Sequence, residues 1–253
     1  MSFSHRAVLC LDESGKKWID AAFVHFASLY ALEPVQKYTL IDLTKEFFPF
    51  DLEGKEEDAD LVTTRLCEIL ALDPNEFTSV FMEFPESDKK PTHIDRLGEA
   101  WKEHAVSIAA QHAKHGAYRL ELPMAAPGNL ELLVVSIAPQ LMKVKLFLDF
   151  GEDHISTPQA ELAATYFGFG TILVNSSWET DESVSKFIPF TSNEKYSYLT
   201  LPELSYALAL YGYIQNLETT DWMQPLEQDG RLLVSETLEY LNQTNDVPEE
   251  LKG

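Results

Sequence analysis

With 253 residues, of which 45% are hydrophobic, the chain is long enough to bury a substantial core as one large domain or two small ones. Asp and Glu total 41 against 19 Lys and Arg, which gives a net charge of −22. A field of that sign repels phosphate backbones and anionic lipid, so it disfavours direct binding to nucleic acid or to a membrane surface. A nucleic-acid mimic that binds a basic protein stays compatible with this charge.

Neither the cysteines nor the apolar segments indicate an exported or membrane-spanning protein. Cys10 and Cys67 each lie in an apolar run and form no C-x-x-C motif, so both are predicted to be reduced core residues. The amino terminus lacks the apolar stretch and the cleavage pattern of a signal peptide. No segment approaches the ~18 consecutive apolar residues of a transmembrane helix. We therefore expect a cytoplasmic protein with no membrane span.

The first half of the chain predicts helices and strands in mixture. Apolar spacing favours helices over 17–32 and 60–70, the second one capped by Asp60, and a histidine-bearing helix over 96–114. The first helix is expected to bury Trp18, Ala22, Phe26 and Leu29, and the second Leu61, Val62, Leu66, Ile69 and Leu70. Strands are expected at 7–11, 37–43, 77–84 and 116–122.

The second half predicts mostly helices. A long apolar helix is expected over 130–147. Thr157, followed by a proline, is predicted to cap the next helix, and Thr200 with Glu203 matches the Thr-x-x-Glu capping box of another. A last helix is expected at about 231–241, followed by a frayed tail.

Strands early in the chain and helices late in it predict an α+β fold. We expect a single domain over 1–253, with a mixed part over about 1–125 and a helical part over about 126–245.

Several short motifs follow one another between residues 48 and 211. They are Phe48-Pro49, the segment 66–84, Gly116-Ala117-Tyr118, the apolar segment 132–146, YFGFG at 166–170 with Asn175 and Ser176, the segment 198–203 with Glu203, and YALAL at 206–210. In this order they resemble a family of largely uncharacterised bacterial proteins with a zincin-like core. The resemblance implies a zincin-like fold.

In such a family a His-Glu-x-x-His helix holds zinc, because residues i and i+4 face the same way and the intervening Glu serves as general base. A carboxylate from the next helix completes the ligand set. The resemblance assigns the first His to Pro139, the Glu to Gln140, the second His to Lys143 and the third ligand to Thr157. Glu161, one turn beyond Thr157, belongs to the same vestigial set.

None of the residues at the four assigned positions suits zinc. Pro139 offers no donor atom and is expected to kink the helix at a cost of about 3 kcal/mol. Gln140 is neutral and cannot act as a base, and Lys143 is a cation. The resemblance therefore implies a dead metal site, no cofactor, and a non-catalytic binding or regulatory role with an unknown protein partner. If the assignment is shifted along the chain, 130–147 is simply a buried helix.

Two other constellations offer alternatives. His104, His112 and His115 share one helical face and could bind zinc or nickel in a metal-binding protein or hydrolase. The same pattern is typical of an exposed helix whose basic residues suit the dipole at its end. The acidic segment 149–154 could hold a hard cation, but it lacks the calcium-loop spacing and its terminal Glu, which favours a plain acidic turn between two helices.

The remaining patterns indicate packing or partner binding. The glycines of Phe167-Gly168-Phe169-Gly170 favour close helix packing over ligand approach. Nucleophile-elbow, phosphate-loop and dinucleotide-binding motifs are absent from the sequence. A third hypothesis is therefore an acidic protein-protein interaction or inhibitor protein of unrelated α+β fold.

Overall fold

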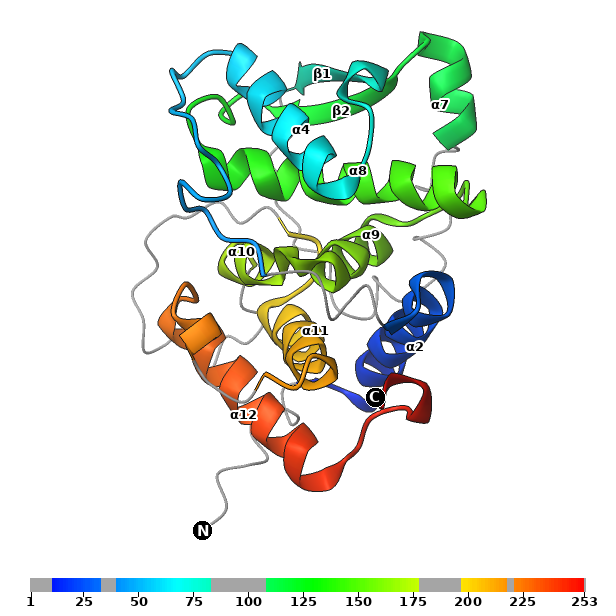
Figure 1. Cartoon of the computed structure of the whole chain (residues 1–253), viewed down its shortest axis with the longest axis vertical. Coiled ribbons are helices and arrows are strands. Elements are labelled where there is room, and N and C mark those ends of the chain that lie inside the picture. Colours follow the sequence, from blue (N-terminus) through cyan, green and yellow to red (C-terminus); the bar gives the residue numbers. More distant parts are fainter. Residues whose placement is uncertain (1–10, 33–39, 83–107, 178–196, 218–220, 253) are drawn as a thin grey trace. The chain divides into compact units, whose positions relative to one another are not determined.

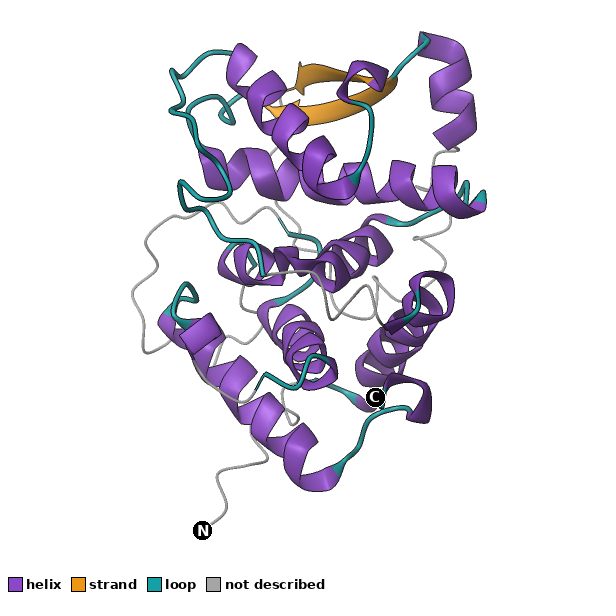
Figure 2. Cartoon of the chain, in the orientation of Figure 1, coloured by secondary structure: helices purple, strands orange, loops and turns teal. Residues whose placement is uncertain are grey.

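The computed structural model describes residues 11–32, 40–82, 108–177, 197–217 and 221–252 (Figure 1). These residues form helices and one small parallel sheet, which is compatible with the predicted α+β class (Figure 2). They group into two compact units, residues 44–160 and residues 1–43 with 161–253. Cys10, His104 and most of the predicted strand at 7–11 lie outside the described residues.

The unit formed by residues 44–160 contains the sheet. Its elements are α4 (Glu57–Leu70), η1 (Pro74–Glu76), β1 (Phe77–Met82), α7 (Ile108–His115), β2 (Tyr118–Pro123) and α8 (Leu130–Phe150). The two strands run parallel, in register from Phe77 opposite Tyr118 to Met82 opposite Pro123. The predictions of strands at 77–84 and 116–122 are thus confirmed within one or two residues, as far as the described residues extend.

Helix α8 is the long apolar helix that the sequence predicts, and it packs against α4 and β2. The side chain of Asn129 caps its start by accepting a hydrogen bond from the Leu132 N–H at 3.0 Å. Gly151, with a φ of 75°, ends it in the left-handed conformation that favours glycine. Pro139 lies inside, but α8 continues through it as one helix, so the expected kink does not divide the element.

The other unit is helical in its described part. Its elements are α2 (Glu13–Tyr30), η2 (Thr165–Phe169), α10 (Gly170–Asn175), α11 (Leu201–Ile214), η3 (Asp221–Met223), α12 (Gln228–Thr244) and η4 (Glu249–Leu251). Helix α9 (Thr157–Ala164) contributes its last turn to this unit. Helix α11 contacts α2, α10 and α12, and its residues are almost all buried. It forms the centre of this unit's core.

The glycines in the segment Phe167–Gly170 have two different roles. Gly168 has a φ of 96° and breaks the helical path within η2. A Cβ at Gly170 would approach Leu208 Cδ1 at 2.8 Å and Thr165 Cγ2 at 2.9 Å, which leaves no room for a side chain. The predicted role in close helix packing is therefore confirmed for Gly170.

Two predicted helix faces are confirmed only in part. Phe26 of the first helix is buried, and so are Val62, Leu66 and Leu70 of the second, whereas the other predicted core residues are half-buried or exposed. Helix α2 buries Gly15, Ile19, Asp20, Phe23 and Phe26, because Asp12 caps it and it begins before residue 17. Helix α4 begins at Glu57 and leaves the predicted core residue Leu61 45% exposed. The inward faces of both helices include an aspartate, which apolar spacing alone assigns to the surface.

Two further predictions fail at the edges of the second unit. Of the strand predicted at 37–43, residues 37–39 lie outside the described residues, and residues 40–43 form no strand; the Ile41 N–H donates to the Gly168 carbonyl at 2.9 Å. The predicted frayed tail is instead ordered in η4, with Val247 and Leu251 buried. Two apolar side chains in a polar segment are enough to fix it against α2. Within the described ranges, no helix combines the length and apolarity needed to cross a bilayer.

Candidate functional site

Pro139 and Gln140 of α8 are integrated into the structure of the sheet-containing unit. Pro139 is buried, so its ring contributes to the core. The Gln140 amide pairs with the backbone of Glu121 on β2, since Oε1 accepts from N–H at 2.9 Å and Nε2 donates to the carbonyl at 2.9 Å. Nε2 also donates to the Ser136 carbonyl at 2.7 Å. Gln140 therefore acts as a short extension of the sheet.

Lys143 and Thr157 are brought into direct contact. The Lys143 ammonium donates to Thr157 Oγ1 at 2.9 Å, across the turn between α8 and α9. These are the positions that the resemblance gives to the second histidine and to the third ligand. A neutral hydroxyl beside a cation does not attract a second positive charge, so this donor set does not fit a divalent metal.

The start of α9 differs by one residue from the prediction. The helix begins at Thr157, and Ser156 occupies the cap position. Gln159 Oε1 accepts from the Ser156 N–H at 3.0 Å, while Ser156 Oγ accepts from the Gln159 N–H at 3.4 Å. This reciprocal pairing is a capping box, and it leaves the Thr157 hydroxyl to Lys143.

Glu161, one turn beyond Thr157 on α9, is a buried carboxylate in the helical unit, only 3% exposed. Its oxygens accept from Ser197 Oγ at 2.9 Å, the Tyr198 N–H at 2.8 Å and the Leu199 N–H at 2.9 Å. Burial raises the pKa of Glu161 to about 7 against the opposing effect of these donors, and the charge of Glu203 adds to the rise.

Glu203 forms the predicted capping box with Thr200 at the start of α11. Its Oε2 accepts from the Thr200 N–H and hydroxyl, both at 2.7 Å. The Thr200 hydroxyl accepts from the Glu203 N–H at 3.4 Å, so the box is confirmed. Glu203 is 4% exposed, and it lies close enough for its charge to raise the pKa of the buried Glu161.

The predicted histidine site lies partly within α7. His112 Nε2 lies 3.2 Å from Glu76 Oε2, and its ring centroid lies 4.6 Å from that of Tyr118. Desolvation and the neighbouring cations Arg119 and Lys114 lower the pKa of the exposed His115. Among the residues that the structure describes, no three His, Cys, Asp or Glu side chains are grouped to hold a metal ion. His112 instead packs beside the sheet.

The acidic segment 149–154 holds helices together. Asp153 Oδ1 accepts from the Ala109 N–H at 2.8 Å, and the backbone carbonyl of Asp153 accepts from the Ile108 N–H at 3.3 Å. Both donors lie where the described part of α7 begins. Asp149 forms an ion pair with Lys145 at 3.0 Å. These contacts agree with the prediction of a plain acidic turn.

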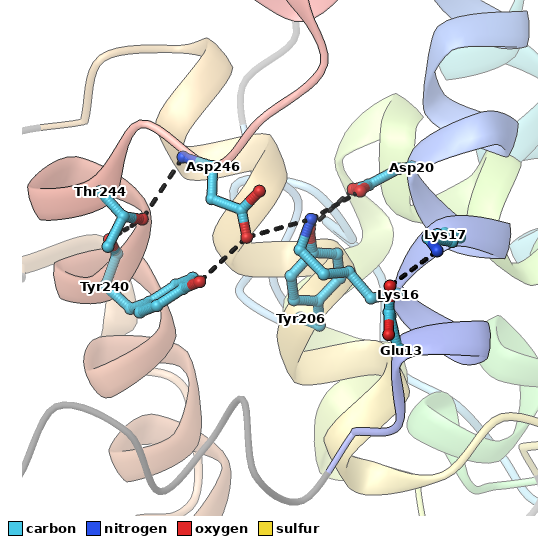
Figure 3. A network of polar contacts seen from close by, with 8 residues as sticks. All are labelled: Glu13, Lys16, Lys17, Asp20, Tyr206, Tyr240, Thr244 and Asp246. Carbon is cyan, nitrogen blue, oxygen red and sulfur yellow. Dashed lines mark hydrogen bonds and ion pairs between the residues drawn. The ribbon is translucent and has the colours of Figure 1, made fainter.

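Sequence patterns missed a polar network that joins α2, α11 and the end of the chain (Figure 3). Asp20 accepts from the Tyr206 hydroxyl at 2.6 Å and from Lys16 Nζ at 2.8 Å. Lys16 also lies 3.5 Å from Asp246, which accepts from the Tyr240 hydroxyl at 2.9 Å. Of these contacts, only the Lys16–Asp20 pair could have been predicted from the sequence, because the two residues lie four positions apart on one helix.

The electrostatics of this network favour a structural role over proton transfer. Burial disfavours the Lys16 ammonium, but the hydrogen bond and charge of Asp20 outweigh it and raise the lysine pKa. Burial and the charge of Asp20 raise the pKa of Tyr206, so its phenol stays a hydrogen-bond donor. The network therefore has a structural role, in which the ion pair between Lys16 and Asp246 connects the segment after α12 to α2.

Comparison of the chain with protein-family models, with curated proteins and with solved structures found no match.

Proposed function

We propose that the chain is a zincin-like domain that has lost its metal site and has a non-catalytic binding or regulatory role. The observation that carries this proposal is the 2.9 Å hydrogen bond between Lys143 and Thr157. Two positions that the resemblance gives to metal ligands meet each other, as a shared site requires, but they carry an ammonium and a neutral hydroxyl. Such a pair stabilises a helix turn and offers no zinc chemistry.

The arrangement of Gln140 supports the same proposal. A general base needs a carboxylate that is open to a bound water. Gln140 has an amide in its place, and both of its polar atoms are used by backbone groups of Glu121 and Ser136. The residue at the position of the general base therefore stabilises the sheet, by binding the backbone of β2.

Metal binding tests the proposal in two steps. We expect the purified protein to contain and bind no stoichiometric zinc by elemental analysis and calorimetry. The variant Pro139→His, Lys143→His should gain weak zinc affinity, and adding Thr157→Glu should tighten it at least tenfold. Stoichiometric zinc in the wild-type protein would refute the proposal.

The matched control adds Gln159→Glu to the two histidine substitutions, because it brings the same charge to the same turn of α9. If it tightens zinc binding as much as Thr157→Glu does, charge alone explains the gain. The assigned ligand geometry would then be wrong.

The charge of the chain favours a second candidate, an acidic protein that binds a basic partner. With 41 acidic against 19 basic residues, long-range attraction would accelerate association with a cationic surface. The test is binding to a polylysine peptide between 0.05 and 0.5 M salt. A strong fall in affinity with salt is expected, while absence of binding at low salt would contradict this candidate.

A further inference from the structure

The two strands of the small sheet are also its two edges, since within the described residues the sheet consists of β1 and β2 alone. A strand at an edge presents unpaired N–H and C=O groups that can pair with another chain. Proteins usually cover or block such edges with side chains, charges or proline. In this respect the edges of β1 and β2 differ.

The outer edge of β2 is blocked. Glu121 directs its N–H and C=O away from β1, because both groups bind the Gln140 side chain, each at 2.9 Å. Successive residues of a strand direct these groups to alternate sides, so Pro123 faces the same edge and has no N–H to offer there. An added strand therefore finds no free donor at either position.

The outer edge of β1 is open. Residues 120 and 122 of β2 flank Glu121 and therefore direct their N–H and C=O groups towards β1. In a parallel ladder the residues opposite them direct the same groups outward, and these residues are Ser79 and Phe81. Within the part of the chain that the structure describes, the outward N–H and C=O groups of Ser79 and Phe81 have no hydrogen-bond partner.

The residues of β1 suit the addition of a strand. Its sequence, FTSVFM, is mostly aromatic, β-branched or apolar, and it includes no charge and no proline. Thr78 is exposed and the other five residues are half-buried, whereas β2 alternates between buried and more exposed residues. Val80 and Phe81 thus leave apolar surface on the two faces of the sheet, which a neighbouring strand would cover.

The charge of the chain indicates which kind of strand would be added. With a net charge of −22, two copies of the chain repel each other, whereas a cationic partner is attracted. The approach to β1 has the same sign, because Asp73 and Glu76 lie just before the strand and are both exposed. These charges are complementary to a segment that carries lysine or arginine.

We propose that the outer edge of β1 binds an extended, cationic segment of a partner protein, which adds to the sheet as a third strand. Backbone hydrogen bonds to Ser79 and Phe81 would hold the segment, and its basic side chains would be attracted by the acidic surroundings. The inference rests on the second candidate function, the binding of a basic partner, and names the surface and the conformation of that partner.

Hydrogen exchange in the whole chain tests the edge directly. The probe is a short peptide of alternating lysine and valine, and the control peptide has the same sequence with every backbone amide methylated, which keeps the charge but prevents strand pairing. A saturating amount of the probe should slow exchange of the Ser79 and Phe81 amides at least about tenfold. Exchange of the Glu121 amide, which is already bound to Gln140, should not change, and the methylated peptide should leave all three amides unaffected.

The outcomes separate this inference from the function on which it rests. If the chain binds polylysine and the probe, but Ser79 and Phe81 exchange as fast as in the free protein, the edge of β1 is not the binding surface. If the chain binds neither polylysine nor the probe at low salt, the second candidate function fails together with the inference.

A pair of variants at one position attributes binding to the edge. Ser79→Pro removes an outward N–H and no bond of the β1–β2 ladder, so it should fold and weaken probe binding at least about tenfold. Ser79→Ala keeps the N–H and should bind as the wild type does. Equal affinities of the two variants would refute the proposal, and if Ser79→Pro does not fold, the exchange measured in the wild type decides. A wild-type dimer that Ser79→Pro converts to a monomer would assign the edge to a second copy of the chain and overturn the cationic partner.

Discussion

Replacement of Asp58 by alanine is expected to be among the most destabilising single changes in the sheet-containing unit. Asp58 is 2% exposed and accepts four backbone hydrogen bonds. Three come from the N–H groups of Glu53, Gly54 and Lys55 at 2.8–3.1 Å, and the fourth comes from Gly128 at 3.0 Å. One carboxylate therefore ties the turn before α4 to the turn before α8.

The expected magnitude follows from these donors. A hydrogen bond to a charged group contributes about 1.5–3 kcal/mol to stability. The four contributions are not additive, because the donors at 53–55 can turn towards water once the side chain is gone. We expect Asp58→Ala to lower the free energy of unfolding by about 3–5 kcal/mol.

The pH dependence provides a second signature. Burial opposes ionisation of Asp58, but the four backbone N–H groups outweigh it and lower the pKa below 3.8. A lowered native pKa contributes stability that is present above pH 3.8 and is lost as the pH falls through the native value. The difference between wild type and Asp58→Ala should therefore shrink below about pH 3.5.

Urea denaturation at pH 7 and pH 3 measures both effects. The matched control is Asp60→Ala, since Asp60 lies in the same first turn of α4 but is exposed. The two aspartates share the helix-dipole contribution, which is about 0.3–1 kcal/mol. If Asp58→Ala costs no more than Asp60→Ala at pH 7, the hydrogen-bonded carboxylate does not stabilise the fold as argued.

Three further changes have defined outcomes. Gly128→Ala should lower the free energy of unfolding by about 2–4 kcal/mol in thermal denaturation, because φ at Gly128 is 80° and a Cβ there would lie 3.1 Å from the Gly54 Cα. The control Gly151→Ala, which has open space around it, should lower the free energy of unfolding by only about 1 kcal/mol. Tyr206→Phe should lower stability by about 1.5–3 kcal/mol through loss of its bond to Asp20, and a neutral result in urea denaturation would argue against the network. Gln140→Glu should lower the melting temperature at pH 7, because a carboxylate cannot donate to the carbonyls of Glu121 and Ser136. The decrease in melting temperature should become smaller towards pH 4, and equal melting temperatures of variant and wild type at pH 7 would contradict the assigned contacts.

The apolar pattern predicted the elements far better than the polar contacts between them. Helix α8 and the capping box at Thr200 were predictable because their signals lie within a few neighbouring residues. Asp58, Glu161 and Asp20 each accept from a donor that is distant along the chain, and these donors, on Gly128, Ser197 and Tyr206, lie 70, 36 and 186 residues away. No local pattern specifies such long-range pairs, so apolar spacing alone gave no reason to expect the aspartates of α2 and α4 to be buried.

The same reasoning explains why the lost-site hypothesis could be formulated but not decided from sequence. The assignment of Pro139, Lys143 and Thr157 rests on local motifs, whereas the contact between Lys143 and Thr157 joins two helices. The sequence can show that an ammonium stands where a ligand is expected. Only the fold can show that this ammonium has a hydrogen-bond partner.

The energetics of that contact make the designed zinc site a fair test. Replacing Lys143 and Thr157 removes one hydrogen bond, worth about 1 kcal/mol. Removal of Pro139 from the helix interior should offset part of that loss, because proline is the least favourable residue there. Zinc binding to a correctly built site contributes about 10–16 kcal/mol. If the variant with Thr157→Glu and both histidines folds but binds zinc no better than the control with Gln159→Glu and both histidines, the assigned geometry is wrong. Helices α8 and α9 would then not be the ligand helices of a former metal site.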